Sequence, residues 1–329
     1  MKANPLHNAI LQGFPRRWSR RSGLGTLAIV WIAVTPALEP VAEPPRLAPL
    51  VPFPDSKDFF QRLFGEETEQ DQQKLRAIEI SGRQKREYGA SAVRAYLDHL
   101  KRQGIRVVSR GKDVDYLRDL VETIRPLMND PQRYPSIKVY LAKSPDCEAR
   151  VFPGGSLVMF DGMLETAQNE AALVGMVGHE LSHLDRGHLL ADLRRVRLAE
   201  ETFSDGPGPQ SPGEFFDAGT LLMRLWTRPF RPEHEAEADR DGARWAYLAG
   251  YDPRELAAMF LRARDRSKGP RLALPWFLQS HPPLEERHRA VMAEYHQLQQ
   301  QNPSAALYVG EENLRTRRAR GSQRDQPSR

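Results

Sequence analysis

Two histidines four residues apart in one apolar segment constrain this 329-residue chain more than any other feature. The segment AALVGMVGHELSHLDRGH contains His179, Glu180 and His183 in the pattern HExxH. On a helix, positions i and i+4 lie about 40° apart, so both imidazoles can face one ion, as Zn²⁺ requires. The alternative is a pair of solvated histidines on a surface helix. A separate apolar face predicts that the core holds this helix, and its members are Leu173, Val174, Val177, Leu181 and Leu184.

A third ligand would decide between these alternatives, and the acidic segment 233–239 supplies a candidate. Glu235 and Asp239 are again i and i+4 on a predicted helix. This spacing lets Glu235 reach the metal while Asp239 accepts a hydrogen bond from a ligand imidazole. Pro232 suits the first turn of that helix. Taken without the HExxH pattern, the segment has a simpler explanation, because an acidic first turn complements the helix dipole.

The order of the motifs resembles the M48 family of zinc metallopeptidases, of the HtpX, Oma1 and Ste24 types. The resemblance covers about residues 75–298, and the segments that carry it are 151–160, 179–183, 235–239, 249–253 and 281–287. It implies one Zn²⁺ ion held by His179, His183 and Glu235. It also implies that Glu180 is the catalytic base and that Asp239 supports a ligand from behind.

Three protein ligands would leave zinc an open position for a water molecule, whose pKa it lowers to about 7. Glu180 projects beside the metal and can take the proton of that water and return it to the leaving amine of a peptide. The oxyanion of the transition state needs a further donor, and the sequence does not choose among His281, Arg231, His234 and Tyr251. The resemblance implies that the loop of His281 approaches the active site, which makes it a candidate catalytic residue. The alternative is a histidine that only caps or packs.

Together with the resemblance, the periodicity predicts an α+β fold, a mostly helical zincin-type metallopeptidase domain with a small antiparallel sheet next to the HExxH helix. Helical patterns occupy residues 69–103, 114–128, 164–199, 233–250, 253–266 and 283–300. Short β-branched or aromatic runs predict strands at 136–142, 148–152 and 156–160. The resemblance suggests an edge strand that binds substrate by strand addition, here Leu157, Val158, Met159 and Phe160. A plain internal hairpin strand is the alternative.

The two ends of the chain differ from its body. Five cations precede an apolar run of 16 residues at 23–38, which makes roughly 24 Å of helix against a hydrocarbon core of roughly 30 Å. This favours an export signal over a permanent anchor, and a buried core helix is a further alternative. We expect a signal peptide or signal anchor at 1–37, a Pro-rich linker at 38–68, the peptidase domain at 69–302 and a disordered basic tail at 303–329. The Gly/Pro-rich stretch 204–213 is expected to be an exposed loop, either a lid or a loop without function.

These features predict an exported zinc endopeptidase of protein quality control, located in the periplasm or secreted. The family resemblance implies misfolded or membrane-associated polypeptides as substrates, and the N-terminal segment is a route to the membrane. The main alternative is a non-proteolytic, chaperone-like or assembly module, against which Glu180 argues because structural zinc sites need no carboxylate base. Nucleic acid is not an expected partner, since the net charge of +5 equals the five N-terminal cations. The single cysteine excludes an internal disulfide framework.

Overall fold

The computed structural model describes residues 69–204, 230–267, 283–303 and 306–320. Every described residue belongs to the unit Pro54–Arg329. The expected signal (1–37), the expected linker (38–68), nearly all of the loop at 204–213 and His281 lie outside the described residues. None of the helices described is both long enough and apolar enough to cross a membrane.

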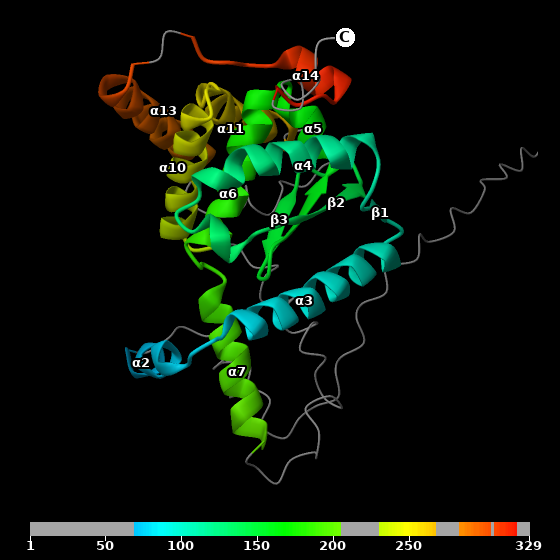
Figure 1. Cartoon of the computed structure of the whole chain (residues 1–329), viewed down its shortest axis with the longest axis vertical. Coiled ribbons are helices and arrows are strands. Elements are labelled where there is room, and N and C mark those ends of the chain that lie inside the picture. Colours follow the sequence, from blue (N-terminus) through cyan, green and yellow to red (C-terminus); the bar gives the residue numbers. More distant parts are fainter. Residues whose placement is uncertain (1–68, 205–229, 268–282, 304–305, 321–329) are drawn as a thin grey trace, which may run out of the picture. The chain divides into compact units, whose positions relative to one another are not determined.

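The described part is mostly helical and contains one small sheet (Figure 1). The strands are β1 (Arg106–Val108), β2 (Lys138–Lys143), β3 (Ala149–Phe152) and β4 (Ser156–Phe160). The helices before and around the sheet are α2 (Glu69–Ala77), α3 (Gly82–Arg102), α4 (Lys112–Ile124) and α5 (Asp161–Ala167). The later helices are α6 (Glu170–Asp185), α7 (Leu190–Ser204), α10 (Pro232–Leu248), α11 (Arg254–Ser267), α13 (Leu284–Gln301) and α14 (Glu311–Thr316).

The sheet is mixed, with the order β1-β2-β4-β3, and this corrects our expectation of an antiparallel sheet. β3 and β4 form an antiparallel hairpin. Its turn contains Gly154 and Gly155 at φ values of 83° and 85°, which glycine adopts without strain. The hairpin inserts β4 between β3 and β2, so β4 runs parallel to β2. Strand patterns alone do not reveal such an insertion, because they indicate where strands occur and not which of them pair.

The central position of β4 shows that our interpretation of it as a substrate-binding edge strand is wrong. Leu157, Val158, Met159 and Phe160 are all buried. β4 pairs with β2 on one side and with β3 on the other. The backbone N–H and C=O groups on both edges of β4 are therefore hydrogen-bonded to neighbouring strands, so an added peptide strand cannot pair with β4. Within the described residues, β1 and β3 are the edge strands, and of these two β3 packs against α6.

Helix α6 carries the HExxH motif and is buried along its whole length. The side chain of Asn169 caps its N-terminus by accepting a hydrogen bond from the N–H of Ala172 at 2.9 Å. The helix packs against α4, α10, α11 and β3. In Figure 1, α10, α11 and α13 lie together on one side of α6, and the strands lie on the other. The motif is thus embedded in the core, which excludes the alternative of a solvated surface helix.

The crossing of α6 and α10 depends on glycine. A Cβ atom added to Gly242 of α10 would lie 2.6 Å from the carbonyl oxygen of Gly175 and 3.0 Å from the backbone nitrogen of His179. A Cβ atom added to Gly178 would lie 3.0 Å from the Cα of Gly242. The two backbones are therefore nearly in contact, and this close approach brings the acidic residues of α10 next to the histidines of α6.

Residues 306–320, which we call the C-terminal strap, pack onto the domain. Our expectation of a disordered tail from residue 303 is therefore wrong for this segment. Tyr308 forms an isolated β-bridge with Tyr251. The carbonyl of Gly310 accepts a hydrogen bond from the N–H of Glu170 at 3.1 Å, at the start of α6. Leu314 is buried. The arginines of this segment suggested disorder, but its backbone contacts and apolar side chains extend the domain beyond residue 302.

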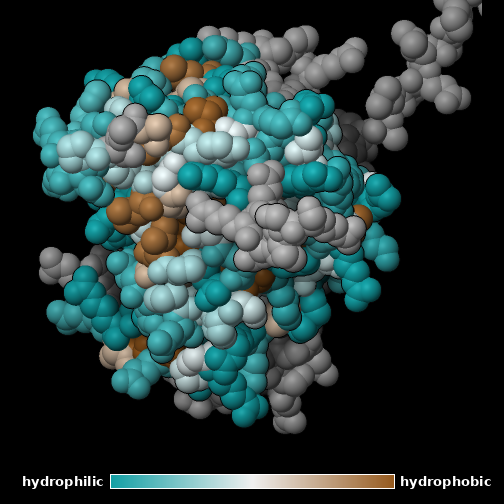
Figure 2. Space-filling model, turned by 45° about the horizontal axis from the view of Figure 1, so that its top comes forward, coloured by the Kyte–Doolittle hydropathy of each residue, from teal (hydrophilic) through white to brown (hydrophobic). Residues whose placement is uncertain are grey.

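The face of the molecule in Figure 2 is mostly hydrophilic, and its hydrophobic residues appear in small, separate groups. Among the described residues, Leu248 is the one exposed large hydrophobic residue, at 49%. The described domain therefore covers its own core.

Candidate metal centre

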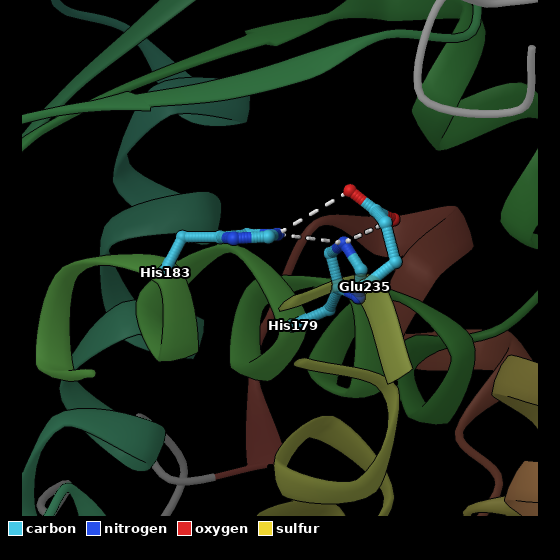
Figure 3. Close-up of side chains that lie close together, drawn as sticks. All are labelled: His179, His183 and Glu235. Atoms are coloured by element: carbon cyan, nitrogen blue, oxygen red, sulfur yellow. Dashed lines mark hydrogen bonds and ion pairs between the residues drawn. The ribbon is translucent and has the colours of Figure 1, made fainter. Parts of the chain in front are cut away.

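Three buried side chains converge between α6 and α10, namely His179, His183 and Glu235 (Figure 3). The Nε2 atoms of the two imidazoles are 3.3 Å apart. The Oε2 atom of Glu235 lies 3.6 Å from Nε2 of His179, and its Oε1 atom lies 3.8 Å from Nε2 of His183. Each of the three side chains is 1% exposed. Consecutive turns of α6 thus present both histidines in one direction, and the first turns of α10 place the carboxylate opposite them.

The donor set fits a tetrahedral Zn²⁺ site. Two nitrogens that each bind one ion at about 2.0 to 2.1 Å stand about 3.3 Å apart at the tetrahedral angle, which is the separation of the two histidine nitrogens. Within the described residues, neither carboxylate oxygen of Glu235 has a hydrogen-bond partner, although both are buried. Buried charged oxygens are costly unless they are paired, and a cation at the centre of this cluster would pair them.

Behind the cluster, Asp239 holds the ring of His179. Its Oδ1 atom lies 3.0 Å from Nδ1 of His179, so the imidazole can donate there and leave Nε2 free for a metal. Arg287, from the first turn of α13, donates to both oxygens of Asp239, from Nη2 at 2.7 Å and from Nε at 2.8 Å. Burial opposes the ionisation of Asp239, but Arg287 outweighs it, so the pKa of Asp239 lies below its ordinary value. The carboxylate is therefore charged and fixed.

Arg287 also lies close to the third candidate ligand. Its Nη2 atom is 3.2 Å from Oε2 of Glu235, in an ion pair that is fully buried. Burial raises the pKa of Glu235, and the charge of Arg287 partly offsets this effect. The HPPLEER segment carried part of the family resemblance, but we assigned no role to its arginine. A buried arginine behind two carboxylates cannot be recognised in the sequence, because the same residue on an exposed helix would look identical.

Glu180 lies beside the cluster and is 2% exposed. Neighbouring helix residues point about 100° apart, so Glu180 does not share the direction of His179. Burial raises the pKa of Glu180 to about 7; His179 opposes the rise, and the carboxylate of Glu235 adds to it. A carboxyl group that titrates near neutrality can both accept and return a proton. The position and the chemistry of Glu180 suit a general acid–base group.

His188, which our sequence reasoning missed, contacts the other histidine of the cluster. Its Nδ1 atom lies 2.8 Å from Nδ1 of His183, and its Nε2 atom lies 3.0 Å from Oε2 of Glu237. Burial, assisted by the nearby His234 and partly opposed by Glu237, lowers the pKa of His188 to about 4, so the ring is neutral at pH 7. A signal was present in the sequence, because Gly187 directly after the helix is a typical helix-ending residue that returns the chain toward its last turn.

The remaining candidate donors are placed differently. The hydroxyl of Tyr251 donates to Glu170 at 2.8 Å, at the first residue of α6 and more than two turns away from His179. Arg231 is exposed, and the ring of His234 stacks on that of His188 with centroids 4.2 Å apart. His281 lies outside the described residues, so its catalytic role remains a prediction.

The fold and the cluster together define a metallopeptidase-like domain of the α+β class, in which one buried helix carries two candidate metal-ligand histidines and a carboxyl group. The family model described as "Peptidase family M48" matches residues 115–294, more than half of the chain, and the chain belongs to this family. The resemblance inferred from the motifs and the expected fold class are thus confirmed, apart from the strand arrangement of the sheet.

Several curated proteins are similar to this chain. The "Beta-barrel assembly-enhancing protease" of Escherichia coli (strain K12) is 27% identical over 158 residues, which are 45% of this chain and 32% of the relative. "Metalloendopeptidase OMA1, mitochondrial" of Danio rerio is 28% identical over 162 residues, 46% of this chain and 34% of the relative. "Metalloprotease YcaL" of Escherichia coli (strain K12) is 24% identical over 180 residues, 54% of this chain and 68% of the relative. The matches thus cover about a third of the first two relatives.

Proposed function

We propose that the protein is a zinc-dependent endopeptidase, with His179, His183 and Glu235 as the zinc ligands and Glu180 as the acid–base group. One observation carries this proposal: three buried donors converge at zinc-like spacing, and the carboxylate of Glu235, whose oxygens accept no hydrogen bond within the described residues, faces both histidines. A second buried carboxyl group, that of Glu180, belongs to the residue that follows His179 in α6. An arrangement that served structure alone would have no use for this second carboxyl.

Different residues of the chain perform proton transfer, ligand orientation and charge balance in peptide hydrolysis. Zinc bound at this site would supply a Lewis acid for the peptide carbonyl and a water molecule of lowered pKa. Glu180 removes a proton from the attacking water and returns it to the leaving amine. Asp239 keeps the Nε2 atom of His179 directed at the metal. Arg287 forms ion pairs with Asp239 and with Glu235. Its positive charge therefore balances part of the negative charge of the buried site.

For the biological role, we propose an exported peptidase that acts on misfolded or membrane-associated polypeptides. Two features support this proposal. The order of cations, apolar run and Pro-rich stretch in the first 53 residues suits an export signal. The printed name of one relative links a protease to β-barrel assembly. Intact-mass measurement of the protein recovered from outside the cytoplasm tests the export step, and a mass lacking about the first 37 residues is the expected result.

The enzymatic proposal is tested by measuring metal content and proteolysis on the same purified protein. We expect close to one zinc ion per chain and cleavage of casein that stops with 1,10-phenanthroline and returns with added zinc. Glu180→Gln should keep its zinc but lose cleavage by about 10²-fold or more, because it removes the proton acceptor and leaves the ligands intact. Glu235→Gln should lower the zinc content, because it weakens a ligand.

Glu79→Gln serves as the control, since Glu79 is exposed and remote in sequence from the motifs. It should leave both zinc content and cleavage unchanged. Undiminished turnover in Glu180→Gln would refute the mechanism. Full zinc occupancy with no cleavage of any unfolded substrate by the unaltered protein would favour the non-proteolytic module instead.

A further inference from the structure

The two histidines of the cluster are held from behind in different ways. A carboxylate, that of Asp239, contacts His179 directly at 3.0 Å. His183 contacts a second imidazole instead, that of His188, and a carboxylate follows only after it, in Glu237. The proposed mechanism gives no task to His188 or Glu237, although the side chain of His188 is only 4% exposed.

The geometry fixes where the protons lie along the hydrogen-bond chain from His183 through His188 to Glu237. The Nε2 atom of His183 faces His179 and Glu235, so Nδ1 of His183 must carry the proton when Nε2 binds a metal. That proton is donated to Nδ1 of His188 over 2.8 Å. The proton of His188 then resides on its Nε2 atom and is donated to Oε2 of Glu237 over 3.0 Å. Each nitrogen has one role, and neither ring needs to be protonated twice.

The backbone at the end of α6 holds this hydrogen-bond chain in place. Gly187 adopts φ 74°, the left-handed conformation of a helix-ending glycine. The N–H of Gly187 donates to the carbonyl of Leu184 at 3.2 Å, and the N–H of His188 donates to the carbonyl of His183 at 3.1 Å. This pair of hydrogen bonds is the Schellman pattern of helix termination. His188 is therefore tied by its backbone to the same residue that its side chain contacts.

Neighbouring rings and charges restrict the side chains further. The ring of Phe230 stacks on that of His183 with centroids 3.8 Å apart, and the ring of His234 stacks on that of His188 at 4.2 Å. Oε1 of Glu237 lies 3.7 Å from Nη1 of Arg186, which sets the carboxylate at the outer end of the chain. The imidazole of His188 is thus confined on one face by His234 and at both nitrogens by its hydrogen-bond partners.

We propose that His188 and Glu237 are positioning residues for the metal ligand His183, fixing the orientation and the tautomer of its ring through an imidazole relay. The inference rests on the proposed zinc site. Groups that contact a ligand from behind commonly alter metal affinity by about 10-fold to 100-fold when they are removed. Because the relay acts on metal binding, it can be measured without reference to proteolysis.

The test is a zinc affinity measurement on the full-length protein by competition with a chelator of known affinity. His188→Leu should weaken zinc binding by about 10-fold to 100-fold, because Nδ1 of His183 loses its acceptor. His188→Asn should recover most of the affinity, because the asparagine oxygen can occupy about the place of Nδ1 of the imidazole. Glu237→Gln should cost about threefold, because a neutral amide accepts a hydrogen bond more weakly than a carboxylate.

The matched control is His296→Leu, which removes an exposed imidazole from α13 and should leave zinc affinity unchanged. Nitrogen-15 NMR of histidine-labelled, zinc-loaded protein gives a second readout. It should show His183 protonated at Nδ1 and His188 protonated at Nε2. Wild-type affinity in His188→Leu, or His188 protonated at Nδ1, would overturn the relay. Absence of zinc binding by the unaltered protein would instead refute the proposed function itself.

Discussion

Arg287 and Asp239 are 48 residues apart in the chain and form a buried, bidentate ion pair directly behind the candidate metal ligands. The Nη2–Oδ1 distance is 2.7 Å, and the Nε–Oδ2 distance is 2.8 Å. The guanidinium also stacks over the ring of Phe260, with its central carbon 4.4 Å from the ring centroid. One cation thus joins α10, α11 and α13 and balances the charge of the site.

Replacing this arginine should destabilise the fold severely. Arg287→Met leaves the carboxylate of Asp239 buried without its cation, and breaking such a pair typically costs about 3 to 5 kcal/mol. Urea denaturation of the metal-free protein, followed by circular dichroism, measures the loss. Arg83→Met is the control, because Arg83 pairs with Glu87 on an exposed helix face, and it should leave stability unchanged. Adding Asp239→Asn to Arg287→Met should recover part of the stability, and a strictly additive double variant would contradict the coupling.

Adding one methyl group at the helix crossing should disturb both stability and metal binding. The new Cβ atom in Gly242→Ala would meet the carbonyl of Gly175 at 2.6 Å and the backbone nitrogen of His179 at 3.0 Å. We expect a loss of about 1 to 3 kcal/mol, as for other overpacked cores, together with weaker zinc binding. Gly82→Ala makes the same change where the nearest neighbour would be the end of the Arg86 side chain at 3.5 Å, and should be harmless. Equal thermal shifts in the two variants would count against close packing of α6 and α10.

The charge of Glu170, the first residue of α6, should make stability depend on pH. Its Oε1 atom accepts hydrogen bonds from the hydroxyl of Tyr251 at 2.8 Å and from the N–H of Arg320 at 3.0 Å. Burial nevertheless raises the pKa of Glu170 above its ordinary value of 4.5. A carboxyl group of this kind stabilises the fold below its unfolded pKa, and the contribution is lost as the pH rises through its folded pKa.

Glu170→Gln does not titrate and keeps an acceptor oxygen. The midpoint of thermal unfolding of the variant should therefore rise relative to that of the unaltered protein as the pH increases above about 4.5. Glu311→Gln, on the exposed side of the strap, should show no such trend. A difference that grows in the opposite direction would mean that Glu170 is stabilised as the carboxylate.

The C-terminal strap should contribute measurably to the stability of the domain. Leu314 is 6% exposed, and Leu314→Ala should cost about 2 kcal/mol, near the lower end for buried leucines. Leu248→Ala removes the same atoms from a side chain that is 49% exposed and should cost less than about 0.5 kcal/mol. Differential scanning calorimetry distinguishes the two cases. Equal effects would indicate that the strap does not pack in solution.

The sequence predicts the centre of the candidate site well, because helical periodicity is a local property. The i and i+4 spacing of His179 and His183, and again of Glu235 and Asp239, fixes the faces on which these side chains lie. The approach of the two helices was inferred from chemistry, and the glycines that permit it became meaningful only in the structure. Glu180 follows directly from its place beside a ligand.

The supporting residues could not be predicted in the same way, because their roles depend on tertiary contacts. Arg287 stands in an ordinary charged helix start and reveals its role only when α13 packs on α10. The insertion of β4 into the sheet depends on strand pairing, which alternation of side chains does not encode. The arginine content of the strap predicts disorder, whereas backbone hydrogen bonds at residues 308–310 fix its place.

The position of the C-terminal strap in the sequence also determines when the domain can finish folding during synthesis. The backbone of residues 309 and 310 and the N–H of Arg320 close on the first turn of α6, and Arg320 is 150 residues downstream of its partner Glu170. Because a chain is synthesised from its N-terminus, the HExxH helix leaves the ribosome well before the segment that clamps it. A chain interrupted before residue 306 would carry every candidate zinc ligand and lack that clamp. Completion of this domain is thus postponed until a late stage of its own translation.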